Sequence, residues 1–266
     1  MSDMVQVTGL KKTYDGGGRR VEAIGNITFT VPRSQFACIV GPSGAGKTTL
    51  LKCLAGLLEP TSGEIRIEGS PVTGPPPGMA VVFQEYGRSL FPWKTVQQNV
   101  ELPLRVKGTA KDVRRQQVSE ALAAVGLDDA GDAYPWQLSG GMQQRVAIAR
   151  AIAYQPHVLL MDEPFAAVDA QTRADLEDLV RSLWRTLGIT TLFVTHDVDE
   201  AVYLGERVLV LSASPTLILD DIAVDLPAER DQVDTRSSAS FAALRARVHH
   251  GIQAAKAGKR KLEVPV

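Results

Sequence analysis

A glycine-rich segment between two apolar stretches most narrowly limits what this chain can fold into. Residues 41–49 read Gly-Pro-Ser-Gly-Ala-Gly-Lys-Thr-Thr, which fits the pattern G-x-x-x-x-G-K-S/T. The segment follows residues 36–40, a continuous apolar run of the kind that a fully buried parallel strand requires. Apolar residues then recur at helical spacing over residues 47–57. The sequence therefore predicts a strand, a tight loop and a helix in succession, a context in which a chance match is less expected.

The residues of this loop are suited to hold phosphate groups. Small residues let backbone N–H groups curl around an anion, and the helix that starts near Lys47 points its positive end at the same place. The Lys47 ammonium can reach the β and γ oxygens, and the Thr48 hydroxyl can ligate Mg²⁺. We expect the whole loop to contact a nucleotide, through Gly41, Pro42, Ser43, Gly44, Ala45, Gly46, Lys47, Thr48 and Thr49.

Strand-like and helix-like runs alternate over most of the chain. Alternating or continuous apolar residues predict strands at residues 5–10, 21–31, 65–67, 79–83, 158–161, 190–195 and 208–211. Helical spacing dominates from about residue 95 to residue 154, with polar faces around residues 113–125 and 143–153. It predicts further helices at about residues 172–186, 198–204 and 241–255. The first two strands, joined by a turn at residues 15–18, should form an antiparallel hairpin. The later alternation implies parallel connections, so we expect an α/β core interrupted by a helical insertion.

Two carboxylates follow the predicted strand at residues 158–161. Asp162 and Glu163 stand at its C-terminal end, the edge of an open parallel sheet at which ligands bind. Asp162 is suited to hold Mg²⁺, and Glu163 is suited to polarise the water that attacks the γ-phosphate. Taken alone, an Asp-Glu pair after a strand is a common loop. After a phosphate-binding loop, it becomes the expected metal and water site.

A second glycine-containing segment lies ahead of a predicted helix. Residues 138–145 read Leu-Ser-Gly-Gly-Met-Gln-Gln-Arg. Gly140 and Gly141 let a phosphate approach the backbone, Ser139 can hydrogen-bond to it, and the helix N-terminus adds a second positive dipole. Taken alone, the segment is explained by a capped helix start.

Together these motifs resemble the ATP-binding cassette (ABC) family, over roughly residues 4–225 and in the family's order. Residues 41–49 look like the Walker A loop, residues 138–141 like the signature, and Asp162 with Glu163 like the end of Walker B. The resemblance implies a P-loop NTPase core with a mixed β-sheet, an N-terminal antiparallel β subdomain and a helical insertion. It also implies ATPase activity with ATP and Mg²⁺ as cofactors.

The resemblance gives roles to residues that carry little signal of their own. Gln84 resembles the Q-loop glutamine near the metal and the attacking water, and Asp169 resembles the D-loop residue at the dimer interface. His196 resembles the switch histidine that contacts the γ-phosphate, and Tyr14 is placed to stack on adenine. Without the resemblance, His196 and Tyr14 are ordinary strand-end residues. The expected catalytic groups are Lys47, Glu163 and His196, and the expected metal-binding groups are Thr48, Gln84 and Asp162.

The expected partners also follow from the resemblance. In this family each ATP is held between the Walker motifs of one copy and the signature of the other, which implies a homodimer. The dimer would act on integral-membrane permease subunits, and indirectly on a solute-binding protein, from the cytoplasmic face of the inner membrane. Phe91 and Trp93 are either anchors for a permease helix or core aromatic residues.

Composition agrees with a peripheral subunit. A formal net charge of −1 over 266 residues gives no global positive field, so no nucleic-acid partner is expected. The sequence shows neither a signal-peptide pattern nor an apolar run of about 18 residues. Cys38 and Cys53 lie in apolar surroundings without His or Cys at metal spacing, so both should be buried, reduced side chains.

A narrower resemblance and two alternatives remain at this stage. Residues 83–100, the run LSGGMQQR and the run MDEPFAAVDA resemble importer ATPases for nitrate, sulfonate and taurine-type solutes. An exporter or lipid-transport ATPase uses the same motifs. A soluble ABC ATPase that acts on nucleic acid is the other alternative.

The domain organisation expected is a nucleotide-binding domain at residues 1–225 and a C-terminal tail at residues 226–266. The helical subdomain that carries the signature should span about residues 91–155. The tail should contain an amphipathic helix, whose basic residues are a solvated face, a regulatory element or a membrane contact. Those basic residues are Arg245, Arg247, Lys256, Lys259, Arg260 and Lys261.

Overall fold

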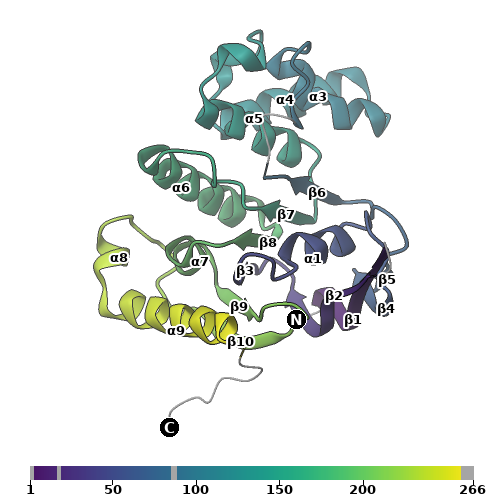
Figure 1. The fold of residues 1–266 in the computed structure, drawn as a ribbon. Helices are drawn as coiled ribbons and strands as arrows, with labels where there is room; N and C mark the ends of the chain where they lie inside the picture. The colour runs from purple at the N-terminus through teal and green to yellow at the C-terminus, as the bar shows by residue number, and fades with distance from the viewer. Residues whose placement is uncertain (1–2, 17–18, 85–88, 259–266) are drawn as a thin grey trace. The chain divides into compact units, whose positions relative to one another are not determined.

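The computed structural model describes residues 3–16, 19–84 and 89–258. The chain divides into two compact units, a first unit of Met1–Pro77 with Thr190–Val266 and a second unit of Gly78–Ile189. The strands of the first unit are β1 (Asp3–Gly16), β2 (Arg19–Pro32), β3 (Phe36–Val40), β4 (Ser62–Ile67), β5 (Ser70–Pro71), β8 (Thr190–Thr195), β9 (Arg207–Leu211) and β10 (Ile218–Ala223). Its helices are α1 (Lys47–Leu54), α7 (Val198–Leu204), α8 (Asp234–Ser237) and α9 (Ala239–Lys256). The second unit holds β6 (Met79–Val82), β7 (Val158–Asp162), α3 (Val96–Val106), α4 (Lys111–Ala124), α5 (Gly140–Ala153) and α6 (Ala170–Leu187) (Figure 1).

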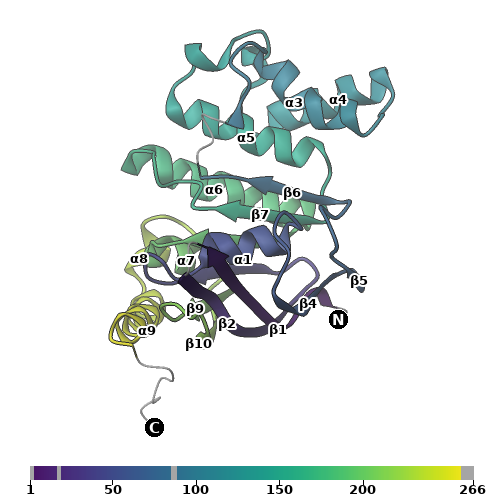
Figure 2. The same ribbon diagram turned by 45° about the vertical axis from the view of Figure 1, so that its right-hand side comes forward.

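The first unit opens with an antiparallel sheet in the strand order β2-β1-β4-β5. β1 and β2 lie side by side as a hairpin, with Tyr14 opposite Val21 and Gly16 opposite Arg19 (Figure 2). The antiparallel N-terminal subdomain expected from the sequence is confirmed. Residues 17 and 18 of the predicted turn lie outside the described residues.

A mixed sheet forms the core of the first unit, with strands in the order β10-β9-β3-β8. β3 runs parallel to both β8 and β9, whereas β10 runs antiparallel to β9. Every residue of β3 is buried, as its apolar run predicts. Val40 at the end of β3 lies opposite Thr195 and Val210. The segments that follow β3, β8 and β9 therefore leave the sheet at the same edge.

Helix α1 begins at Lys47 as expected but ends at Leu54, earlier than the predicted end at residue 57. The backbone reverses at Gly56, whose φ is +65°, and the Leu57 N–H bonds back to the Lys52 carbonyl at 2.9 Å. A left-handed glycine after the last turn is a common way to end a helix, and the apolar spacing alone does not reveal it.

Both cysteines are free and buried, as predicted. Burial raises the pKa of the Cys53 thiol, on α1, to about 11. The thiol therefore stays protonated at neutral pH and packs as a small apolar group.

The second unit combines a short parallel strand pair with a group of helices. β6 and β7 pair with Met79 opposite Val158 and Val82 opposite Met161. Helix α5 packs against α3, α4, α6 and β6 (Figure 1). The predicted helical insertion is present, so the expected fold class is confirmed.

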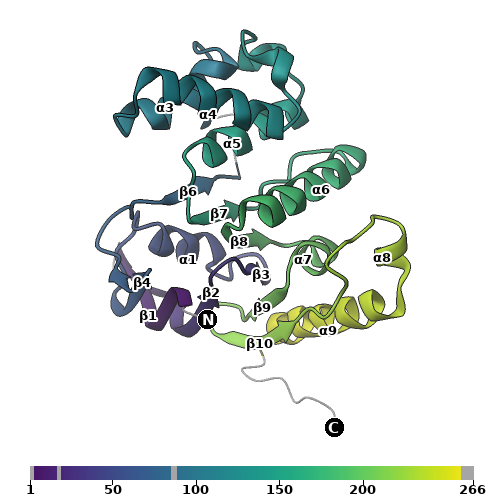
Figure 3. The same ribbon diagram turned by 180° about the vertical axis from the view of Figure 1, so that it is seen from behind.

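The segment after β10 folds back onto the first unit. Helix α9 contacts α7, α8, β9 and β10, and Figure 3 shows α7, α8 and α9 together. On α9, Phe241, Val248 and Ile252 are buried. The division at residue 225 and the helical subdomain at residues 91–155 stay predictions. The basic residues Lys259, Arg260 and Lys261 lie outside the described residues.

Over residues 3–16, 19–84 and 89–258, the structure contains no helix that is both long enough and apolar enough to cross a membrane.

Candidate active site

The loop after β3 takes a conformation that requires its glycines. Gly44 has a φ of +77° and Gly46 a φ of +68°, in the left-handed region that other residues avoid. Gly46 has no room for a side chain either, because a Cβ there would lie 2.9 Å from Thr216 Oγ1 and 3.1 Å from the Ala23 carbonyl oxygen. Gly44 and Gly46 are therefore required by the backbone conformation of the loop, and Gly46 also by the lack of space for a side chain.

Lys47 is the first residue of α1 and lies over the loop. Its side chain is buried, with Nζ donating to the Gly41 carbonyl at 3.0 Å and to the Pro42 carbonyl at 3.3 Å. Among the described residues, no side chain caps the N-terminus of α1. The N–H groups in the first turn of α1 therefore lie uncapped beside the Lys47 ammonium. This arrangement is suited to bind an anion.

Two residues after β9 brace this loop, and sequence analysis missed both. The Thr216 hydroxyl lies 2.7 Å from the carbonyl oxygens of both Ala45 and Ala23, and Thr216 is fully buried. The Ser214 hydroxyl donates to the Gly44 carbonyl at 3.1 Å. In the sequence, these residues stand in a stretch rich in Ser, Pro and Thr after a predicted strand. Such a composition indicates a loop and does not reveal what the loop contacts.

Tyr14 lies close to the end of the phosphate-binding motif. Its side chain is 42% exposed, and its hydroxyl is 3.3 Å from Thr49 Oγ1. The Lys12 ammonium lies 5.4 Å from the centre of the Tyr14 ring. An exposed ring face here is compatible with base stacking, and the adenine contact stays a prediction.

His196 follows β8 and is exposed, between two residues that are held by hydrogen bonds. The Asp197 N–H donates to Thr195 Oγ1 at 3.0 Å, and the Thr195 hydroxyl donates to Glu200 Oε2 at 2.5 Å. Asp197 in turn caps α7 by accepting the N–H groups of Asp199 and Glu200. The imidazole therefore projects from a firmly held stretch of backbone.

In the second unit, the acidic pair ends β7 as predicted. Asp162 is 4% exposed, whereas Glu163 is half-buried and has a φ of +43°. A left-handed conformation at a residue other than glycine is strained, and such strain concentrates at functional sites. The Gln84 amide donates to Glu163 Oε2 at 3.5 Å, so the structure brings these two predicted site residues together.

The signature segment forms the start of α5. The sequence placed Gly140 and Gly141 immediately ahead of a helix, but the structure puts both in its first turn. The helix extends this far because the Ser139 hydroxyl accepts the Met142 N–H at 3.3 Å and so caps it. Ser139 and Gly140 are exposed.

Gly141 lies against the start of α6. A Cβ on Gly141 would come within 2.3 Å of Thr172 Cγ2. Asp169 caps α6 by accepting the Thr172 N–H at 3.0 Å and the Thr172 hydroxyl at 2.7 Å. These hydrogen bonds, the backbone one first, hold the pKa of the Asp169 carboxyl below its usual value. Asp169 and Gly141, two of the predicted nucleotide contacts, thus share Thr172 as a neighbour.

Comparison with known proteins gives the family. The model of the ABC transporter family matches residues 24–166, more than half of the chain. The chain is 45% identical to the nitrate import ATP-binding protein NrtD of Synechocystis, covering 88% of this chain and 87% of the relative. It is 42% identical to the aliphatic sulfonates import ATP-binding protein SsuB of Bacillus cereus, covering 92% and 94%.

A solved structure shares the fold and carries the products of hydrolysis. It is the dimeric post-hydrolysis state of an ATP-binding cassette bound to ADP and Pi, with a TM-score of 0.74 and 33% identity. The match covers 84% of this chain and all of the other. The predictions of the family, of the fold class and of an ATPase are confirmed. The chain belongs to the ABC transporter family and is one of its ATP-binding, ATP-hydrolysing cassettes.

Proposed function

We propose that this cassette drives an importer, in which two copies close around two ATP molecules and power solute uptake through a separate permease. The observation that carries the proposal is that one chain holds two glycine-containing helix starts of complementary kind. The α1 start has Lys47 and no side-chain cap among the described residues, and the exposed α5 start has Ser139. A dimer lets each copy offer its α5 start to the nucleotide on its partner's α1 start.

The residues suit successive parts of ATP hydrolysis. Lys47 and the loop 41–49 would bind and orient the β- and γ-phosphates. Glu163, with the Gln84 amide at 3.5 Å, would orient the attacking water and take its proton. His196 would hold the γ-phosphate from the end of β8. Ser139 and Gly140 of the partner copy would close over the same phosphate.

The oxygen donors also fit a magnesium ion. The exposed Thr48 hydroxyl, the buried Asp162 carboxylate and the Gln84 amide oxygen are hard ligands of the kind Mg²⁺ prefers. When bound, Mg²⁺ would neutralise negative charge that develops on the phosphate groups during hydrolysis. Thr48, Asp162 and Gln84 would fix its place.

The import direction rests on the relatives named above, which import nitrate or aliphatic sulfonates. We propose a small anionic solute of that kind, selected by a solute-binding protein and a permease at the inner membrane. The cassette would sit at the cytoplasmic face of that membrane. Trp93, 70% exposed, is suited to anchor a permease helix, whereas Phe91 is half-buried with its ring 5.4 Å from that of Trp93. Residues 85–88, which precede Phe91, lie outside the described residues.

The mechanism is tested with Glu163→Gln. We expect turnover to fall by about 10²- to 10⁴-fold, as for loss of a general base. The variant should also form a dimer with ATP, measured by light scattering after gel filtration. Glu120→Gln on α4, whose carboxylate accepts a hydrogen bond from Gln116, is the matched control and should hydrolyse ATP normally. A Glu163→Gln variant that stays monomeric with ATP contradicts the shared-site mechanism.

The transport direction needs a separate experiment. The cassette is assembled with its permease in vesicles, and ATP hydrolysis is measured with and without the solute-loaded binding protein. An importer should hydrolyse ATP faster when the loaded binding protein is present. Outward movement of solute, or stable binding to DNA or ribosomes without a permease, contradicts the proposal.

A further inference from the structure

An arginine beyond β10 holds the far end of the helix that follows His196. Arg230 lies in the segment between β10 and α8 and is half-buried. Its Nη1 donates to the backbone carbonyls of Val202 at 3.1 Å, Tyr203 at 2.5 Å and Gly205 at 3.0 Å. The last carbonyls of a helix have no N–H partner within it, and a cation there also complements the helix dipole. Arg230 thus serves as the C-terminal cap of α7.

Further contacts tie the same segment to α7. The Tyr203 hydroxyl donates to the Arg230 carbonyl at 3.3 Å, and Tyr203 is fully buried. The Arg236 guanidinium lies 4.9 Å from the centre of the Tyr203 ring. Backbone and side chains therefore both hold the C-terminal end of α7 against the tail.

The other end of α7 is joined to the backbone around His196 by a closed set of hydrogen bonds. The Glu200 N–H donates to Asp197 Oδ1, the Asp197 N–H donates to Thr195 Oγ1, and the Thr195 hydroxyl donates to Glu200 Oε2. Thr195 and Glu200 are 1% and 4% exposed, so water competes little for these bonds. His196 lies between Thr195 and Asp197, two members of this set. A shift of α7 must therefore shift the backbone that carries the imidazole.

Helix α7 is short enough to act as one rigid piece. It spans Val198–Leu204, about 10 Å at a rise of 1.5 Å per residue. A helix of this length is not stable alone, so contacts at its ends and sides set its position. We propose that Arg230 is a positioning residue for ATP hydrolysis, which acts through α7, Glu200 and Thr195 on the orientation of His196. The inference rests on the proposed role of His196 at the γ-phosphate.

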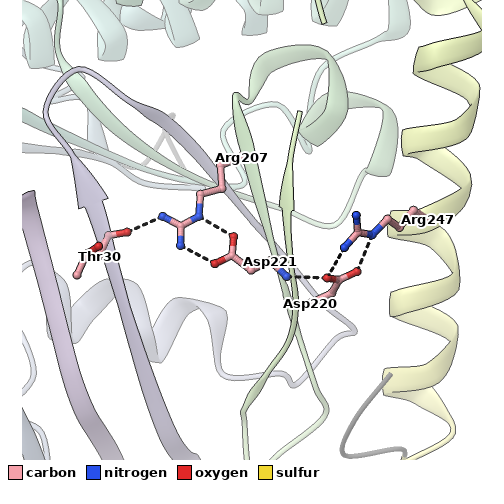
Figure 4. Close-up of polar contacts among 5 residues, drawn as sticks. All are labelled: Thr30, Arg207, Asp220, Asp221 and Arg247. Carbon is pink, nitrogen blue, oxygen red and sulfur yellow. Dashed lines mark hydrogen bonds and ion pairs between the residues drawn. The ribbon is translucent and has the colours of Figure 1, made fainter. Parts of the chain in front are cut away.

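A second arginine in the tail provides a control. Arg247 on α9 donates to both carboxylate oxygens of Asp220 on β10, at 2.8 and 3.0 Å (Figure 4). Next to it, Arg207 joins Asp221 to the Thr30 carbonyl, which ties β10 to β2. The Arg247 guanidinium fastens the tail to β10 through Asp220, and its hydrogen bonds do not involve the α7 carbonyls. Arg247→Met therefore removes a tail guanidinium without removing the cap on α7.

The test compares Arg230→Met with Arg247→Met in the full-length chain. We expect kcat for ATP to fall about tenfold in Arg230→Met, less than the roughly 100-fold that a 1 Å misplacement can cost. KM for MgATP should stay close to the wild-type value, because the loop 41–49 is unchanged. Hydrogen exchange at the Asp197 amide should become faster in Arg230→Met only. Arg247→Met should keep the wild-type kcat.

The alternatives give different outcomes. Equal losses of kcat in the two variants overturn the inference, because the tail then contributes only general stability. A wild-type kcat in Arg230→Met overturns it as well, while loss of hydrolysis in His196→Ala would leave the proposed function intact. Wild-type hydrolysis by His196→Ala contradicts instead the proposed role of the histidine. If Arg230→Met does not fold, Arg230→Gln is measured against Arg247→Gln. The shorter, uncharged amide weakens the cap on α7, so a smaller fall of kcat is expected in Arg230→Gln alone, and equal kcat values in the two variants overturn the inference.

Discussion

The starts of α1 and α5 look alike in sequence and differ in construction. Each helix begins within or beside glycines, and each is a predicted phosphate site. At α1 the preceding glycine, Gly46, is left-handed and, among the described residues, no side chain caps the helix. At α5, Ser139 is extended and its hydroxyl already accepts the Met142 N–H. The α1 start is therefore prepared for an anion, whereas at α5 a ligand must compete with the cap.

The glycines serve different purposes at the two sites. Gly46 is needed for a backbone conformation that other residues avoid, since its φ is +68°. Gly141 is helical and is needed for space, because a Cβ would meet Thr172 Cγ2 at 2.3 Å. A glycine at the start of a helix can therefore indicate a binding loop, as Gly46 does at α1, or close packing between helices, as Gly141 does at α5. The two helix starts should therefore respond differently to mutation.

The largest expected effect is at the α1 start. Lys47→Ala removes the ammonium that lies over the loop, and we expect ATP affinity to fall about 100-fold, since charge-assisted hydrogen bonds are worth roughly 1.5–3 kcal/mol each. Ser139→Ala should leave the affinity of a single copy for ATP unchanged, while slowing dimer-dependent hydrolysis. Binding is measured by titration with a fluorescent ATP analogue at a protein concentration that keeps the chain monomeric.

Lys52→Ala is the control for charge, because Lys52 lies exposed on the same helix. It should bind ATP like the wild type. Equal losses of ATP affinity in Lys47→Ala and Ser139→Ala would contradict the proposed difference between the two helix starts, because both would then contribute to binding in one copy.

An intermediate effect is expected at Gly141. Gly141→Ala forces a methyl group against Thr172 and should lower the free energy of unfolding by about 1–3 kcal/mol, as overpacking does. Thr172→Ser removes Cγ2 but keeps the hydroxyl that bonds to Asp169, so the double variant should regain most of the loss. The free energy of unfolding is measured by urea titration for Gly141→Ala, Thr172→Ser and the double variant. If Thr172→Ser gives no recovery, Gly141 is required for something other than space.

The parts of the site that the sequence predicted are those set by local chemistry. The loop 41–49 and the acidic pair after β7 follow from short motifs next to apolar runs, and both lie where they were expected. The left-handed Glu163 was not predictable, because no property of a glutamate favours a φ of +43°. Its conformation is imposed by the surrounding structure.

Contacts between distant segments were beyond the reach of the sequence. Thr216 braces the loop at Ala45 across a separation of 171 residues, and Arg230 caps α7 from beyond β10. Neither belongs to a motif, and each reads locally as an ordinary loop residue. Helix boundaries failed for a similar reason: α1 ends early at a left-handed glycine and α5 starts early at a serine cap, features that apolar periodicity does not record.

The smallest expected effect concerns the cap of α6, beside the α5 start. Asp169 accepts two hydrogen bonds from Thr172, which hold the pKa of its carboxyl below the usual 3.8. A carboxyl with a lowered pKa in the folded state stabilises the fold above its unfolded pKa, and this contribution is lost as pH falls through the folded pKa. Asp169→Asn should therefore be slightly less stable than the wild type by an amount that is constant from pH 7 to pH 5 and shrinks below pH 3.8. Urea midpoints measure this, with the exposed Asp175→Asn on the same helix as the control; a difference that already shrinks between pH 7 and pH 5 contradicts the assignment.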